Sequence, residues 1–185
     1  MDELWQLFAE DGRPIHGKGA NKDDVFAKGL LHGAAHVWIW RNNNGQTEVL
    51  LQKRAANKRT WPNRLDISAA GHIDLGEGSL TAALRETSEE IGIDVEPELL
   101  EEIVVVKAYM IAENEAIENE FQWLYLLELA NDIKFSLQET EVDSLVWKRL
   151  DDFAQDSSSE LYVPHGKEYY EKVVTAIRAA SSRTN

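Results

Sequence analysis

The sequence predicts an α/β fold in which helices flank a mixed β-sheet. Apolar and β-branched runs indicate more strands than helices. Strands and helices alternate irregularly along the chain, which is typical of a mixed sheet. The chain has 185 residues, of which 43% are hydrophobic, enough to bury the core of one domain. We therefore expect residues 1–185 to form a single domain.

Several segments have the short, apolar and β-branched character of strands. They are residues 4–8, 34–40, 48–53, 66–70, 103–111, 121–129 and 145–150. The polar stretches 17–24, 42–45 and 155–160 are interpreted as loops, because no repeat or low-complexity linker marks a domain boundary. Residues 1–30 are expected to form an N-terminal extension of the domain.

Two helices are predicted. The first covers residues 79–91, where Ser79 is a good N-cap after a glycine and Gly92 supplies the stop. Its core-facing positions recur at helical spacing at Leu80, Ala83, Leu84, Thr87 and Ile91. The second covers about residues 165–181 and repeats Tyr169, Val173, Val174, Ile177 and Ala180 along one face. That face could pack within the chain or against a second copy, which leaves a homodimer open.

Three carboxylates lie close together on the first helix. Glu86 and Glu90 stand at positions i and i+4, with Glu89 beside them and Arg85 four residues before Glu89. Like charges held this close are unfavourable unless a cation lies between them, and carboxylate oxygens are natural ligands of Mg²⁺. A solvated charged helix face is the alternative for such a pattern taken alone. The residues around it favour a metal site.

These acids belong to a longer pattern between residues 71 and 93. It consists of Gly71, five residues, Glu77, seven residues, Arg85-Glu86, two residues, Glu89-Glu90, one residue, Gly92 and the aliphatic Ile93. This pattern resembles the Nudix box position by position, and Thr87 departs from it where an aliphatic residue is usual. The resemblance implies an α/β/α sandwich and a metal-dependent hydrolase that cleaves a diphosphate linkage.

Segments outside this box resemble one branch of the Nudix superfamily, the proteins similar to isopentenyl diphosphate isomerase. They are Leu31-His32, Trp38, Lys53-Arg54, residues 58–62 and 68–72, and the acidic Glu118-Asn119-Glu120. In the isomerase a cysteine that does acid chemistry on the alkene precedes the Gly-His pair, and Ala70 stands at that position here. This chain therefore lacks the thiol that the isomerase mechanism requires. The retained Nudix acids instead favour a hydrolase on an isomerase-like scaffold.

The resemblance also implies roles for the acids. Mg²⁺ or Mn²⁺ ions are expected to bind the carboxylates of Glu86, Glu89 and Glu90. A backbone carbonyl at Ala70 or Gly71 is expected as a further ligand, and Glu120 is the first choice for an acid from outside the box. One of these carboxylates is expected to orient the attacking water. Arg85 is expected to pair with Glu77 or Glu89 and to fix the acids in place.

Two basic residues are candidate phosphate ligands. Arg54 and Lys58 match the diphosphate-binding bases of the isomerase. Arginine suits bidentate contact with a phosphate, whereas lysine acts as a point charge. A solvated basic surface is the alternative interpretation of this segment.

Two histidines are candidate substrate or metal contacts. The isomerase holds a metal among histidines and glutamates, and His32, His72, Glu118 and Glu120 match that set. A histidine expected a few residues earlier is missing near Val25, so this second set is incomplete. The alternative is that His32 and His72 are hydrogen-bonded residues that shape the pocket wall.

Composition excludes several classes of function. The formal charge is −14, from 33 acidic and 19 basic residues, which speaks against nucleic acid as the principal partner. There are no cysteines, so disulfides, a thiolate nucleophile and a cysteine metal site are excluded. The first residues lack the basic and apolar regions of a signal peptide, and no apolar run approaches membrane-spanning length. We expect a cytoplasmic protein without membrane contact.

Three functions are compatible with these patterns. The first is hydrolysis of a nucleoside diphosphate derivative, or of a prenyl or sugar diphosphate, which the intact acid set favours. The second is isomerisation of the isopentenyl diphosphate type, which Ala70 opposes. The third is a Nudix-like module that senses a small phosphorylated ligand without turnover, a role that does not require the acids. The motifs do not specify the group attached to the diphosphate.

Overall fold

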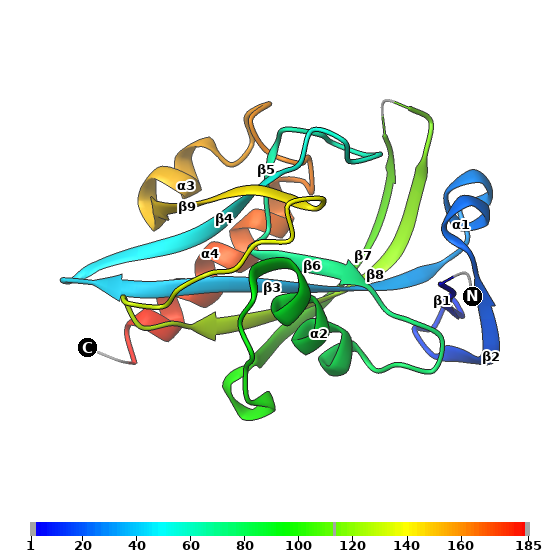
Figure 1. The fold of residues 1–185 in the computed structure, drawn as a ribbon, viewed down its shortest axis with the longest axis horizontal. Helices are drawn as coiled ribbons and strands as arrows, with labels where there is room; N and C mark the ends of the chain where they lie inside the picture. Colours follow the sequence, from blue (N-terminus) through cyan, green and yellow to red (C-terminus); the bar gives the residue numbers. More distant parts are fainter. Residues whose placement is uncertain (1–2, 113, 184–185) are drawn as a thin grey trace.

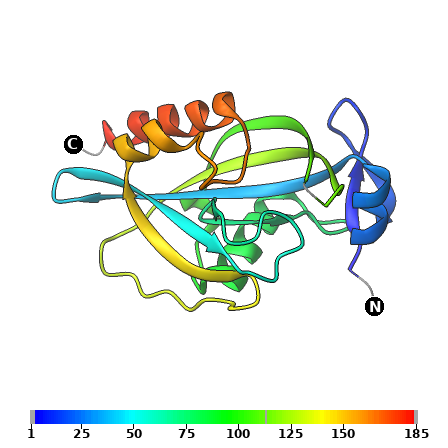
Figure 2. The ribbon, with the colours of Figure 1, turned by 90° about the horizontal axis from the view of Figure 1, so that it is seen from above.

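The computed structural model describes residues 3–112 and 114–183 and places a mixed β-sheet between two helical layers (Figure 1). Helix α2 covers one face of the sheet, while α3 and α4 lie together on the other (Figure 2). The helices are α1 (Lys22–Lys28), α2 (Ser79–Ile91), α3 (Leu150–Asp156) and α4 (Lys167–Ser181), with a short 3-10 helix, η1, at Pro97–Leu99. The predicted α/β/α sandwich is therefore confirmed.

The sheet is organised around strand β3. The strands are β1 (Trp5–Phe8), β2 (Pro14–Ala20), β3 (His32–Asn43), β4 (Gln46–Arg54), β5 (Leu65–Asp66), β6 (Ala69–His72), β7 (Glu101–Ile111), β8 (Ile117–Glu128) and β9 (Val142–Arg149). β3 pairs antiparallel with β4 and β6 and parallel with β8. β7 extends the sheet beyond β8, and β9 extends it beyond β4.

Strand β3 is buried on both faces from its first residue to Trp40. Its side chains alternate between two cores. Trp38 and Trp40 pack in the core beneath α3 and α4, whereas Val37 and Ile39 pack in the core beneath α2. Burial on both faces explains why this segment is a nearly continuous apolar run, and it fixes the register of every strand that pairs with β3.

Helix α2 has the predicted bounds but not the predicted cap. Gly78 is the N-cap residue, and Ser79 lies inside the helix. The Ser79 hydroxyl lies 2.9 Å from the Tyr125 hydroxyl and makes no capping bond, so the assignment of Ser79 as N-cap is wrong. Strand β8 begins at Ile117, before the predicted start at residue 121, because residues 117–120 already pair with β7.

The single strand predicted at residues 66–70 consists of two short strands. β5 ends at Asp66 and β6 begins at Ala69. Between them the Ser68 hydroxyl donates to the Leu50 carbonyl at 2.7 Å and accepts from the Ile39 amide at 2.8 Å. This buried side chain replaces backbone pairing at that point, which interrupts the strand.

Two predicted loops are shorter than expected. Within the predicted loop 42–45, β3 runs to Asn43 and β4 resumes at Gln46, so a tight hairpin turn joins them. The predicted loop 155–160 overlaps the end of α3, which runs from Leu150 to Asp156. Leu150 was expected to end a strand, but it is the first residue of this helix. Acidic residues in its first turn suit the helix dipole.

The N-terminal loop predicted at residues 17–24 is wrong, because β2 and α1 occupy it. Helix α1 has seven residues; the Asn21 side chain caps its start, and Gly29 ends it in the left-handed region at φ 60°. Val25 and Phe26 are its buried residues. A helix this short has too few apolar positions for a periodic pattern, and β2 is too exposed to show alternation.

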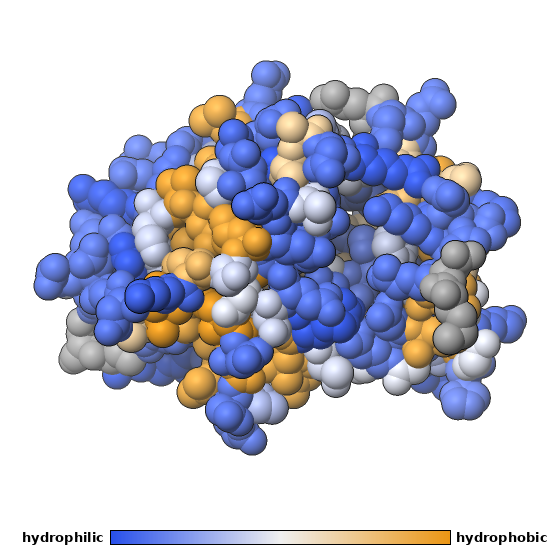
Figure 3. Space-filling model, in the orientation of Figure 1, coloured by the Kyte–Doolittle hydropathy of each residue, from blue (hydrophilic) through white to orange (hydrophobic). Residues whose placement is uncertain are grey.

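The surface of the chain is largely hydrophilic. On the face drawn in Figure 3, hydrophobic residues gather mainly in one region left of centre, and hydrophilic residues cover most of the rest. None of the helices in the described part of the chain has the length and apolar character needed to cross a bilayer.

Replacing Phe153 with alanine is expected to destabilise the fold by about 3–5 kcal/mol, because a cavity would remain in the core beneath α3 and α4. Phe153 is fully buried, and its ring centroid lies 5.5 Å from that of Tyr170. Urea unfolding followed by circular dichroism measures the free energy. Leu161→Ala is the control, since Leu161 is 61% exposed and its loss should stay within about 0.5 kcal/mol. Equal losses in the two variants would contradict this placement of α3.

Candidate active site

A pocket of about 430 Å³ opens beside α2, β6 and β8, with the segments that follow β4 and precede α4 completing its wall. Its lining is mostly polar and charged. It includes the acids Glu86, Glu89, Glu90, Glu118 and Glu120, the bases Arg54, Lys58 and Arg59, and the histidines His36, His72 and His165. His32 is fully buried next to this lining. The site residues expected from the sequence therefore gather around one pocket.

Glu86, Glu89 and Glu90 form an acid cluster on α2, and two of them are buried. Glu90 is 4% exposed, and its Oε2 accepts from the Ala70 amide at 3.0 Å and from the Gln52 side chain at 3.3 Å. The Glu86 side chain is 14% exposed, whereas that of Glu89 is 55% exposed. Glu86 and Glu90 are thus part of the pocket wall, and Glu89 lies towards solvent.

The two buried acids resist ionisation. Burial raises the pKa of Glu86 to about 7, even though Arg85 favours the charged form. Burial and then the charge of Glu86 raise the pKa of Glu90 to about 8. A divalent cation between such carboxylates would favour their charged forms, so the acid cluster has the electrostatics of a metal-binding group.

Gly71 makes room for the acid cluster. A Cβ at this position would lie 2.0 Å from the carboxyl carbon of Glu86, far inside van der Waals contact. The reason for this glycine is close packing, because its φ is not in the left-handed region. Gly76 differs, since its φ of 85° favours glycine at the turn. Gly78 has neither constraint, because nothing lies within 4 Å of its would-be Cβ.

Arg85 links the acids to the loop before α2. Its Nε and Nη2 donate to the Glu77 carboxylate at 3.1 and 3.0 Å. Its Nη1 donates to Glu86 at 2.5 Å and to Glu89 at 3.3 Å, and Nη2 also donates to the His72 carbonyl at 2.9 Å. Burial alone would lower the pKa of Arg85, but these carboxylates raise it. Both expected partners, Glu77 and Glu89, are present.

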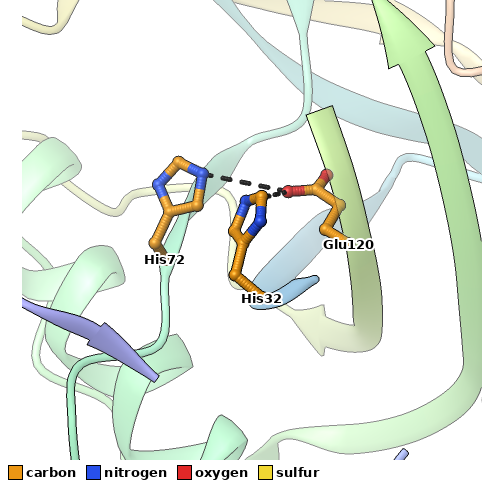
Figure 4. Close-up of side chains that lie close together, drawn as sticks. All are labelled: His32, His72 and Glu120. Carbon is orange, nitrogen blue, oxygen red and sulfur yellow. Dashed lines mark ion pairs between the residues drawn. The ribbon is translucent and has the colours of Figure 1, made fainter. Parts of the chain in front are cut away.

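His32, His72 and Glu120 form a histidine group (Figure 4). The parallel register of β3 and β8 sets His32 beside Glu120, and β6 sets His72 opposite Ala34. Glu120 Oε2 lies 3.2 Å from His32 Nε2 and 3.8 Å from His72 Nε2. One candidate ligand atom from each residue lies within 4.8 Å of the others. His32 Nδ1 donates to the Leu30 carbonyl, so the polar contact of the buried Nε2 is the Glu120 carboxylate.

Packing and charge hold the histidine group in place. The Trp5 ring stacks on His72 with 3.5 Å between centroids. Burial lowers the pKa of His72 well below its usual value. Burial would raise the pKa of Glu120, but His32 outweighs it and keeps this carboxyl ionised. Among the described residues, the polar contacts of Glu120 are with the histidines and Gln122. Glu120 therefore belongs with the histidines and not with the acid cluster.

Glu118 lines the same pocket as Glu120, as expected for residues i and i+2 of one strand. Burial and then the charge of Glu120 raise the pKa of Glu118 to about 7. Val25, near which the resemblance expects a further histidine, is fully buried with Trp5 and Phe26. Helix α1 thus contributes an apolar contact at this place.

The two candidate phosphate ligands are already engaged by the protein. Arg54 donates to the Asp66 carboxylate at 2.9 Å and to the Thr60 carbonyl at 3.0 Å. Lys58 Nζ pairs with the Glu141 carboxylate. Both basic side chains line the pocket, and their charges lower the pKa of Glu90 against the effect of burial.

A further buried network in this pocket was not expected from the sequence. His165 Nε2 lies 2.9 Å from Asp66 Oδ1, and His36 Nδ1 lies 2.7 Å from the Tyr169 hydroxyl. Burial lowers the pKa of His36 to about 4. Burial would raise the pKa of Asp66, but His165 and then Arg54 hold it low. Asp66 and His165 are 99 residues apart, so no local motif could have indicated this pair.

Comparison with known proteins identifies the family. Residues 30–172 match the model of the NUDIX domain. Nudix hydrolase 3 of Arabidopsis thaliana is 34% identical over 170 residues, which cover 89% of this chain but 22% of that protein. An uncharacterized Nudix hydrolase of Clostridium acetobutylicum is 35% identical, covering 83% of this chain and 73% of that protein. Isopentenyl-diphosphate Delta-isomerase 2 of Photorhabdus laumondii is 31% identical, covering 81% and 79%.

Solved structures agree on the fold. A crystal structure of a Deinococcus radiodurans protein superposes with a TM-score of 0.68 at 16% identity, covering 92% of this chain and 98% of that chain. The Ap4A hydrolase of C. elegans, solved as a binary complex, gives a TM-score of 0.58 at 25% identity, covering 80% and 98%. The family model and the sequence relatives, together with the box on α2, show that this chain belongs to the Nudix hydrolase family, whose members act on phosphoanhydride bonds.

Proposed function

We propose that this chain hydrolyses a diphosphate linkage in a small phosphorylated molecule, using Mg²⁺ or Mn²⁺ held by the acid cluster. The observation that carries the proposal is the burial of Glu86 and Glu90 on the wall of one polar pocket. Burying two carboxyl groups together is costly, and stability alone gives no reason to retain them. Membership of the Nudix hydrolase family supports the same reaction.

The acid cluster fits the proposed ions. Its donors are all carboxylate oxygens, the hard ligands that Mg²⁺ and Mn²⁺ prefer. Glu86, Glu89 and Glu90 would hold the ion, and the backbone carbonyl of Gly71 is proposed as a further ligand because Gly71 lies against Glu86. When bound, a divalent ion offsets negative charge on diphosphate oxygens and makes a water molecule more acidic.

The histidine group is proposed as a separate cation site. His32 Nδ1 donates to the Leu30 carbonyl, so in the neutral ring His32 Nε2 carries no hydrogen and directs its lone pair at the Glu120 carboxylate, 3.2 Å away. This arrangement is typical of a metal-binding histidine, in which one ring nitrogen is oriented and the other is available. With His72 and Glu120, the group offers two nitrogen donors and one carboxylate.

Contacts within the protein would keep the reacting groups in position. Arg85 orients Glu86, while the Ala70 amide and Gln52 orient Glu90. Holding the acids in one geometry lowers the entropic cost of reaching the transition state. We propose that a carboxylate of the acid cluster, or Glu120, orients the attacking water and accepts its proton.

Arg54 and Lys58 are proposed to supply positive charge for the substrate phosphates. Lys58 is the more direct candidate, because one ion pair with Glu141 leaves its ammonium group with further donors. Arg54 is fixed by Asp66 and Thr60, so its charge would act from within the pocket wall.

Isopentenyl diphosphate isomerisation is the second candidate, because the histidine group resembles the metal ligands of that enzyme. Ala70 lines the pocket where the isomerase has its cysteine, and the chain contains no cysteine. A methyl group cannot donate a proton to an alkene, so hydrolysis remains the better supported function. A ligand sensor would instead bind a phosphorylated molecule tightly without turnover.

Glu90→Gln should reduce hydrolysis by about 100-fold or more, since it removes a charged ligand of the proposed metal ion, which would offset negative charge in the transition state. The assay measures phosphate and phosphomonoester released from nucleotide, sugar and prenyl diphosphates with Mg²⁺ or Mn²⁺. Glu98→Gln is the matched control, because Glu98 is exposed and lies outside the pocket lining. If the wild type cleaves no substrate but binds one tightly, the sensing role is correct; alkene isomerisation without cleavage would support the second candidate.

Metal ions should stabilise the chain more at about pH 8 than at about pH 5, as measured by thermal unfolding. In the folded chain the pKa values of Glu86 and Glu90 are raised to about 7 and 8, above about 4.3 for an unfolded glutamate. Between these values the folded state binds more protons, so stability falls as pH rises. A divalent ion bound to the ionised carboxylates offsets this loss of stability, so its effect is larger at the higher pH. An equal stabilisation at both pH values would contradict metal binding by these groups.

Gly71→Ala should lower hydrolysis by about 100-fold, because the new methyl group must displace the Glu86 carboxylate. Gly78→Ala is the matched control, since its added methyl group meets nothing within 4 Å. Steady-state kinetics with the best substrate of the panel measures both variants. Wild-type activity in Gly71→Ala would show that the close approach of Gly71 and Glu86 has no role in the reaction.

A further inference from the structure

The guanidinium group of Arg54 is held by two residues of the pocket wall. Its Nη1 donates to Asp66 Oδ2 at 2.9 Å, while its Nε and Nη2 donate to the Thr60 carbonyl at 3.3 and 3.0 Å. A guanidinium group carries five N–H donors, so these three contacts leave donors for a ligand. The Arg54 side chain is 14% exposed and lines the pocket. Its guanidinium group is therefore oriented and still able to bind.

The carboxylate of Asp66 is held in turn through its other oxygen. Asp66 Oδ1 accepts from the Ile67 amide at 2.9 Å and lies 2.9 Å from His165 Nε2. Burial would raise the pKa of Asp66, but His165 and then Arg54 hold it low. An ionised carboxylate only accepts hydrogen bonds, so His165 Nε2 carries the hydrogen of this contact. Each oxygen of Asp66 thus has its own side-chain partner.

Helix α4 holds the ring of His165. The ring stacks on Tyr169 with 4.8 Å between centroids, and it meets the Tyr170 ring edge-on at 5.9 Å. The Tyr170 hydroxyl donates to the Val163 carbonyl at 2.6 Å, which ties the segment before α4 to the helix. A continuous line of contacts therefore runs from α4 through His165 to the carboxylate of Asp66.

Fold stability is a weak reason for this arrangement. Removing charged groups from water offsets much of what their mutual attraction contributes. Arg41 and Glu48 form a similar pair, in which both side chains are 15% exposed and the closest atoms are 2.7 Å apart. That pair lies outside the pocket lining, whereas Arg54, Asp66 and His165 all line the pocket.

Holding Arg54 in advance favours phosphate binding. An arginine side chain has several rotatable bonds, and their freedom is lost when the planar guanidinium group binds a phosphate. The contacts with Asp66 and Thr60 remove much of that freedom before a ligand arrives, which improves affinity.

We propose that Asp66 and His165 are positioning residues, which hold the Arg54 guanidinium group in place for a phosphate of the substrate. Asp66 acts on Arg54 directly, and His165 acts through Asp66. The proposal rests on the proposed function, because that function assigns Arg54 to the substrate phosphates. Through His165, helix α4 contributes to phosphate affinity without contact with the ligand.

The sign of the change in affinity separates positioning from charge. The Asp66 carboxylate repels a phosphate, so charge alone predicts tighter binding when the carboxylate is neutralised. Loss of positioning predicts weaker binding. Because Arg54 and His165 already offset the charge of Asp66, we expect positioning to outweigh repulsion in Asp66→Asn.

Binding of methylenediphosphonate tests the proposal without turnover, since carbon replaces the bridging oxygen of a diphosphate. The full chain is titrated by calorimetry with Mg²⁺ present. Arg54→Gln should weaken binding about 100-fold and Asp66→Asn about 10-fold, through loss of charge-assisted hydrogen bonds. Glu48→Gln is the matched control, since it breaks the similar pair with Arg41 outside the pocket. Unchanged or tighter binding in Asp66→Asn, or no binding by the wild type, would overturn the proposal.

A double substitution tests whether Asp66 acts through Arg54. Asp66→Asn combined with Arg54→Gln should bind no more weakly than Arg54→Gln alone, because no guanidinium group is left to orient. Damage to the pocket unrelated to Arg54 would instead add to the loss in Arg54→Gln. Additive losses would therefore contradict positioning.

Two substitutions separate the hydrogen-bond donor of His165 from its ring. Glutamine keeps a donor near the Nε2 position, whereas phenylalanine keeps the ring that stacks on Tyr169 but has no donor. His165→Gln should stay within about 3-fold of wild-type affinity, and His165→Phe should lose about 10-fold. The reverse order would give His165 a packing role only. The Asp66 and Arg54 variants still test the proposal if thermal unfolding shows that a His165 variant fails to fold.

Turnover distinguishes this proposal from the hydrolase proposal. A chain that binds methylenediphosphonate with the expected dependence on Asp66, but cleaves no diphosphate, would refute hydrolysis and support positioning. A chain that cleaves a diphosphate with equal kcat/KM in Asp66→Asn and Glu48→Gln would refute positioning and leave hydrolysis supported.

Discussion

The pairing of β3 with β6 and β8 is the constraint on which the site depends. β3 is buried on both faces from His32 to Trp40, so a shift of one residue would turn apolar side chains to the wrong face. Its fixed register sets Glu120 beside His32 and His72 opposite Ala34. The placement of the histidine group is thus a consequence of core packing.

Three consecutive residues of strand β6 contact both the acid cluster and the histidine group. The Ala70 amide donates to Glu90, Gly71 gives space to Glu86, and the His72 ring stacks on Trp5 near Glu120. Because alternate residues of a strand face opposite sides, one short strand connects the acid cluster to the histidine group. Arg85 strengthens this connection by donating to the His72 carbonyl.

Local patterns in the sequence predict local structure well and distant contacts poorly. The spacing of the acids and of Arg85 predicts their shared helix face, and Gly92 marks the end of α2 as predicted, although the cap at its start is Gly78 and not Ser79. Helix α1 has too few buried residues to produce a pattern. The pairing of Asp66 with His165 joins segments 99 residues apart, and only the folded sheet and α4 bring them together. Arg54 was expected only as a phosphate ligand, and no local pattern indicated its contact with Asp66.

The overall charge bears on the order of events in the proposed reaction. A chain of formal charge −14 with the ionised carboxylates of Asp66 and Glu120 in its pocket repels an anionic diphosphate, and such repulsion is strongest where solvent is excluded. A divalent ion on the acid cluster reverses the local sign, so ion and diphosphate should bind cooperatively. Affinity for the diphosphate should therefore depend on the metal.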